Sequence, residues 1–400
     1  MEKFDAETFA ETQIRKIKET IGGEKAVIAV SGGVDSSTCA VLTHRAIGDN
    51  LVCVILDDAF MREGEPEKIA EILSQPPLNL PMKIEPVQER FLKALGGLRD
   101  AEEKRKAFRK TFYETLSDIA KREGSRLLVQ GTILADIIET KGGIKTQHNV
   151  LEQIGISTRE LYGFKVVEPL VSLLKWQVRE VARYLEIPPQ ISERQPFPGP
   201  GLSIRVVGEI RPDKLATLKT ATTIVEQNLE KHKPSQYFAV IIDNEEKLPH
   251  PKMKGMVEDV AKSLGIRPSN VWAKIYADKA TGLRKKARMY GEIVGLTCRS
   301  EGGELYQPSF RDLNELQRTI VRRNPLVTRV LYAVGEKEGR QPYVVAIRAV
   351  ETRDFLTALV ANIPWLTLKE TADQILKACP NVSLVYYDIT PKPPATIEME

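Results

Sequence analysis

The chain has 400 residues, of which 42% are apolar and 28% are charged, and its formal net charge is +4 at pH 7. This length and apolar content predict two or three globular domains. The nearly balanced charge gives no basic field of the kind that binds nucleic acid. The charged first residues and the absence of an apolar run of about 18 residues lead us to expect neither a secretory leader nor a membrane span.

The four cysteines, Cys39, Cys53, Cys298 and Cys379, are far apart in the sequence. They do not form the close pairs that zinc and redox motifs require. We therefore expect buried, reduced thiols in a cytoplasmic protein.

The first half of the chain alternates short apolar runs with amphipathic segments. The run at 26–30 is typical of a strand buried on both faces in a parallel sheet. Further strands are predicted at 51–56, 82–87 and 126–130, and helices from Val34 onward and at 65–73, 101–121 and 172–185. This alternation predicts an α/β fold with a doubly wound parallel sheet, which binds its ligand at the carboxyl ends of the strands.

A proline- and glycine-rich segment, "RQPFPGPGLSIR" at 194–205, interrupts regular structure. We place the domain junction there, between a first domain at 1–200 and a second region at 201–400. In the second region, strands are predicted at 237–242, 271–276, 327–332, 343–347 and 383–387, and helices at 212–229, 253–264, 313–323 and 368–379. This pattern predicts an α+β region, built as one unit or as two small ones.

The motif "SGGVDSS" connects the first predicted strand to the first helix of the sheet. Unpaired backbone N–H groups and the positive end of a helix meet at such a loop, which suits a phosphate. Asp35 is placed to hold magnesium. The residues expected to bind are Ser31, Gly32, Gly33, Val34, Asp35, Ser36 and Ser37. No lysine follows, so this is not the GxxxxGK[ST] loop. A turn that only caps the helix is the structural alternative.

This motif resembles the pyrophosphate loop of the N-type ATP pyrophosphatase superfamily, whose fold is called adenine nucleotide alpha hydrolase-like. Enzymes of that superfamily cleave ATP between the α and β phosphates and adenylate an oxygen of the substrate. A nitrogen or sulfur nucleophile then displaces AMP. The resemblance implies that the loop binds the leaving pyrophosphate.

Further segments resemble the GMP synthase family, in that family's order: "LLVQGTILADIIE", "IKTQHNV", "RQPFPGPGLSIRVVGEI", "VVAIRAVETRDFLTA" and "YYDITPKPPATIEME". The resemblance implies a ligase that uses ATP and magnesium to adenylate XMP and aminates it with ammonia to give GMP, AMP and pyrophosphate. No glutaminase domain is present in the sequence, so ammonia would come from a separate glutamine amidotransferase subunit or from solution. The second region would be a dimerisation-type region of a cytoplasmic homodimer.

The resemblance also assigns roles to individual residues. ATP would be bound by the loop together with Leu56, Gly131 and Asp136, and magnesium by Asp35 and Asp136. Catalysis would use Asp35, Ser36, Lys145 and His148, and the acceptor would be bound by His148, Asn149, Lys392 and Glu398. Three structural alternatives remain open: Asp136 as a helix cap, a charged helix carrying Lys104, Arg105 and Lys106 as a solvated face rather than a lid, and a mobile tail around Lys392.

The sequence departs from the family pattern mainly on the acceptor side. The paired histidines of the family are Gln147 and His148 here, and the predicted helix before Cys379 lacks the family's arginines. Two alternatives therefore stay open. One is a paralogue that adenylates a different acceptor for amidation or thiolation, and the other is a non-catalytic nucleotide-binding subunit.

Overall fold

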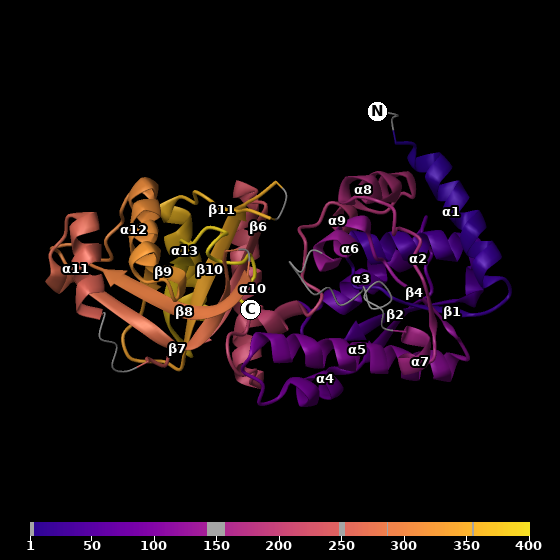
Figure 1. Ribbon diagram of the computed structural model, residues 1–400, viewed down its shortest axis with the longest axis horizontal. Helices are drawn as coiled ribbons and strands as arrows, with labels where there is room; N and C mark the ends of the chain where they lie inside the picture. The colour runs from indigo at the N-terminus through magenta and orange to yellow at the C-terminus, as the bar shows by residue number, and fades with distance from the viewer. Residues whose placement is uncertain (1–3, 142–156, 248–252, 286, 354–355) are drawn as a thin grey trace. The chain divides into compact units, whose positions relative to one another are not determined.

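The computed structural model describes residues 4–141, 157–247, 253–285, 287–353 and 356–400 (Figure 1). The chain divides into two compact units. The first consists of Met1–Ala94 and Lys106–Gly199, and the second of Leu95–Arg105 and Pro200–Glu400. Within the described ranges, no helix is long and apolar enough to cross a membrane.

The first unit is built on a parallel sheet with the strand order β3-β2-β1-β4-β5. Its strands are β1 (Ala26–Ala29), β2 (Leu51–Asp57), β3 (Met82–Pro86), β4 (Leu127–Val129) and β5 (Lys165–Val167). Its helices are α1 (Ala6–Ile21), α2 (Val34–Ile47), α3 (Glu65–Ser74), α4 (Gln88–Leu95), α5 (Ala101–Glu123), α6 (Leu134–Lys141), α7 (Thr158–Tyr162), α8 (Lys175–Tyr184) and α9 (Pro189–Ser192). The first residues of α5, up to Arg105, belong to the second unit. The predicted strands are confirmed, whereas the three-residue strand β5 was not predicted.

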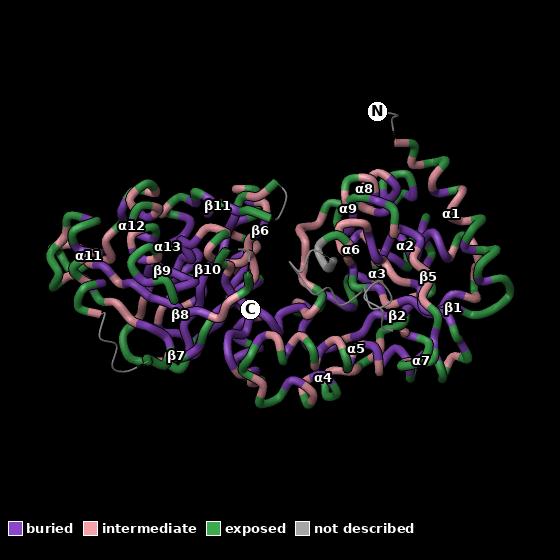
Figure 2. Tube along the Cα trace, in the orientation of Figure 1, coloured by how far each residue is buried: buried purple, intermediate pink, exposed green. Residues whose placement is uncertain are grey.

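Both faces of this sheet are covered, as expected for a doubly wound fold. Ile28 of β1 belongs to an apolar cluster with Val41 of α2 and Val181 of α8. Its neighbour Val27 points to the opposite face, into a second cluster with Leu116 of α5. Almost all residues of β1, β2 and β4 are buried (Figure 2). The continuous apolar run at 26–30 thus has the physical cause that the sequence pattern predicts.

The strand order determines where a ligand can bind in this unit. β1 lies between β2 and β4, so the chain leaves β1 toward one side of the sheet and reaches β4 on the other. The loops after β1 and β4 therefore emerge side by side at the carboxyl ends of the strands, where open α/β sheets bind their ligands.

The second unit contains one seven-stranded mixed sheet with the order β11-β10-β12-β9-β8-β7, and β6 pairs with β10. Its strands are β6 (Gln236–Asp243), β7 (Val271–Arg284), β8 (Ala287–Cys298), β9 (Val327–Glu336), β10 (Tyr343–Glu351), β11 (Leu359–Val360) and β12 (Val382–Asp388). Its helices of eight or more residues are α10 (Pro212–Leu229), α11 (Met253–Leu264), α12 (Phe310–Arg323) and α13 (Trp365–Ala378). The sequence did not predict β8, and it predicted only the first part of β7.

All four cysteines are buried and free. Burial raises the pKa of Cys53 to about 12 and that of Cys298 to about 11. Cys39 and Cys379 also have raised pKa values, because burial disfavours their thiolates. The prediction of buried thiols is confirmed.

Candidate active site

The loop between β1 and α2 presents backbone donors to an anion. Gly33 is the N-cap residue of α2, with φ −77° and ψ 153°, and it supplies no side-chain cap. The first N–H groups of a helix have no partner within the helix, and they carry its positive partial charge. The N–H groups of Val34, Asp35 and Ser36 therefore stand where a phosphate would accept their hydrogen bonds.

Two serine hydroxyls hold the shape of this loop. The N–H of Ser31 donates to Ser36 Oγ at 3.2 Å, and Ser36 Oγ donates to the Gly33 carbonyl at 3.2 Å. The Oγ atoms of Ser31 and Ser36 lie 3.1 Å apart. Ser37 differs, because its side chain is fully buried and its Oγ has no hydrogen-bond partner among the described residues. Ser31 and Ser36 thus bring two hydroxyls together at the loop.

The glycines of the site permit close approach of the backbone. Gly32 has φ +73°, and a Cβ added there would lie 2.2 Å from Ile69 Cδ1. Gly131 follows β4, and a Cβ added there would lie 3.0 Å from the Asp35 carbonyl carbon and 3.0 Å from the Ser36 nitrogen. The structure therefore brings Gly131 against the first turn of α2, as expected from the strand order.

Asp35 faces a cation that the sequence analysis did not identify. Lys175, the first residue of α8, places its Nζ 2.5 Å from Asp35 Oδ2. Asp35 Oδ1 is buried and has no hydrogen-bond partner among the residues that the structure describes. Burial raises the pKa of Asp35, Lys175 opposes this rise, and the charge of Asp136 adds to it. Asp35 is thus a partly desolvated carboxylate with one oxygen available to a ligand.

Asp136 takes part in a local turn and also lies close to the loop. Its Oδ2 accepts a hydrogen bond from the Ile133 N–H at 3.1 Å, which satisfies a backbone donor before α6. Its charge also contributes to the raised pKa of Asp35. The capping interaction and the nearness to Asp35 therefore coexist in one side chain.

At the end of β2, Leu56 is buried, with 6% of its surface exposed. The carbonyl of the next residue, Asp57, accepts from the Val87 N–H at 3.0 Å, and its carboxylate accepts from Gln88 Nε2. These bonds fix the strand end at which the family resemblance places ATP.

Of the predicted acceptor residues, Lys392 and Glu398 lie in the second unit. Lys392 pairs with Ala358 through two backbone hydrogen bonds of 2.8 and 3.0 Å, so this part of the tail is anchored to the unit. Glu398 accepts from Arg205 Nε and Nη2, both at 2.9 Å. The Arg205 guanidinium lies 3.9 Å from the ring centroid of Phe238.

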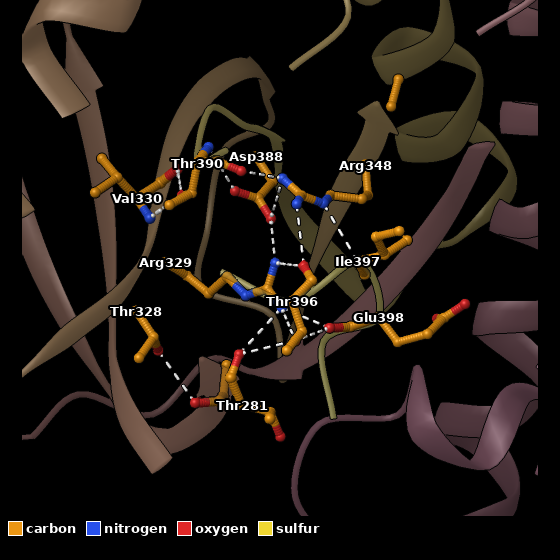
Figure 3. A network of polar contacts seen from close by, with 12 residues as sticks. Thr281, Thr328, Arg329, Val330, Arg348, Asp388, Thr390, Thr396, Ile397 and Glu398 are labelled. Carbon is orange, nitrogen blue, oxygen red and sulfur yellow. Dashed lines mark hydrogen bonds and ion pairs between the residues drawn. The ribbon is translucent and has the colours of Figure 1, made fainter. Parts of the chain in front are cut away.

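A buried ionic network holds the segment between Lys392 and Glu398 (Figure 3). Arg329 and Arg348 each lie 3.2 Å from Asp388 Oδ2, and all three side chains are at most 1% exposed. Both arginines also donate to the Thr396 carbonyl, at 2.8 and 3.1 Å. Burial lowers the pKa of Arg329 to about 9, and Asp388 opposes this. The tail is therefore preorganised by charge-assisted hydrogen bonds.

The alternative of a solvated helix face is wrong for Lys104. Its side chain is 0% exposed, and its Nζ donates to the carbonyls of Val206 at 2.7 Å and Gly208 at 2.9 Å. It also pairs with the carboxylate of Glu400. These partners lie in the same unit but far away in the sequence, so the charge pattern of the helix could not reveal them. Lys145, Gln147, His148 and Asn149 lie outside the described residues.

Sequence reasoning also missed Lys175 and Arg194 as neighbours of the loop. Lys175 stands at the start of an amphipathic helix, and Arg194 stands at the start of the proline-rich segment. A positively charged residue at the start of a helix or of a proline-rich segment is a weak sign of a binding site. The residues that it faces become known only from the fold.

Two families of known proteins match parts of this chain. The family "NAD synthase" matches residues 8–199, and the family "GMP synthase C terminal domain" matches residues 338–399. A solved NMN synthetase from Francisella tularensis is 18% identical, covers 50% of this chain and 79% of its own, and has a TM-score of 0.39.

Three archaeal relatives match over 397 residues, which is 99% of this chain and 100% of each relative. Their identities are 42% for Sulfurisphaera tokodaii, 42% for Saccharolobus solfataricus and 40% for Methanopyrus kandleri. All three are named as the B subunit of glutamine-hydrolyzing GMP synthase. With this identity over nearly its whole length, the chain belongs to the family of GMP synthase B subunits.

Proposed function

We propose that this chain is the synthase subunit of a two-subunit GMP synthase. It would use ATP to adenylate the 2-oxygen of XMP, and ammonia would then replace the adenylated oxygen to give GMP. The observation that carries the proposal is the match to B subunits at 42% identity over 99% of this chain. The helix start after β1, which has no side-chain cap, supports it.

In the proposed reaction, the 2-oxygen of XMP attacks the α-phosphorus of ATP, and pyrophosphate leaves. Ammonia adds at C2 of the purine, and AMP departs with the former 2-oxygen. The N–H groups at the start of α2 and the hydroxyls of Ser31 and Ser36 would donate to the pyrophosphate as its charge increases. Preorganised donors of this kind are a major source of catalysis.

Lys175 and Asp35 have complementary parts in this proposal. The Lys175 ammonium, 2.5 Å from Asp35, would hold the carboxylate charged in the free protein and contribute positive charge beside the phosphates. Gly131 keeps the first turn of α2 open to the ligand, because it adds no side chain there.

The residues present fit a magnesium ion. Asp35 offers a buried oxygen without a hydrogen-bond partner among the described residues, and Asp136 lies close enough to influence its pKa. The described ranges contain no group of three or more acidic, histidine or cysteine side chains that could hold a metal ion by themselves, so phosphate oxygens would complete the ligand set. Bound magnesium would supply charge compensation for the pyrophosphate.

On the acceptor side, we propose that Lys392 binds the 5′-phosphate of XMP and that Glu398 contacts the purine. The paired backbone of Lys392 and the Arg205–Glu398 ion pair support this, because both side chains start from an ordered frame. We further propose that Lys145, His148 and Asn149 belong to the acceptor loop, that a separate glutamine amidotransferase supplies ammonia, and that the chain works as a cytoplasmic homodimer.

The test is a pyrophosphate-release assay with MgATP, XMP and ammonium, run beside a panel of other acceptors. We expect turnover with XMP and a loss of turnover in Asp35→Asn. Asp118→Asn is the matched control, because Asp118 is exposed and pairs with Arg90 on the surface. Turnover with another acceptor but not with XMP would replace GMP synthesis by a different amidation or thiolation. Tight ATP binding without pyrophosphate from any acceptor would identify a non-catalytic subunit.

A further inference from the structure

A buried carboxylate lies beside the phosphate-binding loop and takes no part in the proposed reaction. Glu65, the first residue of α3, is 6% exposed. Its Oε2 accepts from the Arg62 N–H at 2.8 Å, and its Oε1 lies 3.2 Å from Arg62 Nη1. Its Oε1 also pairs with Arg194 Nη2. Glu65 therefore fixes two guanidinium groups at once.

Arg194 reaches the loop at Gly32. A Cβ built on Gly32 would lie 3.4 Å from Arg194 Nη1, in addition to its collision with Ile69. The Arg194 side chain is only 21% exposed, so its charge is partly withdrawn from water. One edge of the guanidinium thus faces Glu65, while Nη1 lies beside the loop backbone.

The segment that carries Arg194 is fastened at a second point. The Arg62 guanidinium lies 4.3 Å from the ring centroid of Phe197, and Arg62 itself is held by Glu65. The stretch from Arg194 to Phe197 is therefore attached to the start of α3 at both of its ends, and Glu65 takes part in both attachments. This arrangement sets the position of the Arg194 guanidinium before any ligand arrives.

Cationic side chains stand at both ends of the loop motif. Arg62 and Arg194 both face the carboxylate of Glu65. Lys175 pairs with Asp35 at the other end of the motif. A dianionic or more highly charged phosphate is the ligand that such an arrangement fits, and a planar guanidinium can donate to two of its oxygens.

We propose that Arg194 is a pyrophosphate-binding residue, which donates to the β,γ-phosphates of ATP at the Gly32 end of the loop, and that Glu65 is its positioning residue. This rests on the proposed cleavage of ATP at this loop. Arg194 would bind the leaving group both in ATP and after cleavage, so it should affect pyrophosphate affinity more than acceptor affinity.

The experiment measures the affinity of the full chain for magnesium pyrophosphate, and for an ATP analogue with a methylene group between the α and β phosphates, by calorimetry. We expect Arg194→Ala to weaken both about 10- to 100-fold, and Arg194→Lys to weaken them less, because lysine keeps the charge but loses the fork. Arg183→Ala is the matched control. Its partner Glu193 lies 3.0 Å away, and that pair is exposed.

A double-mutant cycle tests the positioning role of Glu65. Glu65→Gln should weaken pyrophosphate binding, and Arg194→Ala combined with Glu65→Gln should bind no more weakly than Arg194→Ala alone. Additive losses in the double variant would overturn the positioning role. Arg194→Ala should also keep the wild-type KM for the acceptor.

A variant that loses pyrophosphate affinity at the wild-type melting temperature has lost a binding contact and not its fold. Wild-type pyrophosphate affinity in Arg194→Ala or Arg194→Lys would overturn the proposal, whatever their melting temperatures. These measurements need no acceptor turnover. A wild-type protein that binds pyrophosphate but does not aminate XMP would therefore contradict the proposed function, and the Arg194 variants would still decide the present inference.

Discussion

Lys104 and Glu400 form an ion pair in which neither side chain is more than 1% exposed. The same carboxylate accepts from the Gly208 N–H at 2.9 Å, and the Glu400 N–H donates to the Ile204 carbonyl at 3.2 Å. The pair therefore holds the tail that carries Lys392 and Glu398 against the segment that carries Arg205.

This pair predicts a pH-dependent contribution to stability. Burial raises the pKa of Glu400 from 4.5 to about 7, against Lys104, the Gly208 N–H and Lys214, which favour the carboxylate. Because the folded state binds the extra proton, the stability from this group is fully present below about pH 4.5 and is lost as the pH rises through about 7. The unfolding free energy of the wild type, relative to Glu400→Gln, should fall by about 1–3 kcal/mol between pH 4.5 and 8.

Chemical denaturation at several pH values, followed by a signal from the second unit, measures this difference. Glu301→Gln serves as the control, because Glu301 is 64% exposed and pairs with Arg267 on the surface. A difference between wild type and Glu400→Gln that stays constant with pH would contradict the raised pKa.

Lys175 should set the acid limit of activity. Burial raises the pKa of Asp35, and Lys175 is the main group that lowers it again. Replacing Lys175 by methionine should raise this pKa further, so that protons compete with the metal at higher pH. We expect kcat/KM for ATP to fall in Lys175→Met, and the acid limb of its pH profile to move to higher pH. If the acid limb does not move in a folded Lys175→Met variant, then Asp35 is not the group whose protonation limits activity at low pH.

Gly32 and Gly48 offer a comparison between steric conflict and backbone strain. Both have positive φ, +73° and +57°, but a Cβ on Gly48 would meet no atom within 4 Å. Gly48→Ala should lose about 1 kcal/mol of stability from its backbone conformation and keep full activity. Gly32→Ala should lose more stability, and its KM for ATP should rise, because Ile69 and Arg194 must move. Equal behaviour of the two variants would argue against crowding at the loop.

Arg205 should control the acceptor and not ATP. Its two hydrogen bonds to Glu398 and its stacking on Phe238 require a planar guanidinium. In Arg205→Lys we expect the KM for XMP to rise about tenfold and the KM for ATP to stay unchanged, from the loss of roughly 1.4 kcal/mol. Arg311→Lys is a surface control, because Arg311 is 86% exposed. A parallel rise in both KM values would point to general unfolding.

The elements of the first unit follow from local pattern, because parallel strands buried on both faces are continuous apolar runs. The strand at 26–30 and the loop after it are therefore visible in the sequence. β8 was not predicted, because it is not a continuous apolar run. It contains Gly291 and Gly295, which weaken the strand pattern, and these glycines pack against Thr328 and the ring of Tyr386 in the folded unit.

In the candidate site, too, residues that are contiguous in the sequence could be predicted, and residues brought together by the fold could not. Ser31, Gly33 and Asp35 could be predicted because loop, strand and helix are contiguous. Lys175 and Arg194 could not, since each meets the loop only after the chain has folded. Lys104 was misjudged because its ion-pair partner, Glu400, is remote in sequence, and a helix with many charges gives no sign of which charge is buried.

The four buried cysteines can report local unfolding in each unit. Two of them, Cys39 and Cys53, belong to the first unit, and Cys298 and Cys379 belong to the second. Since burial raises their pKa values and shields the sulfurs, a thiol reagent can modify them only when the surrounding core opens. The labelling rate at each cysteine therefore reports how often the core around it opens. A ligand bound at the β1–α2 loop should lower the labelling rates of Cys39 and Cys53 in the first unit.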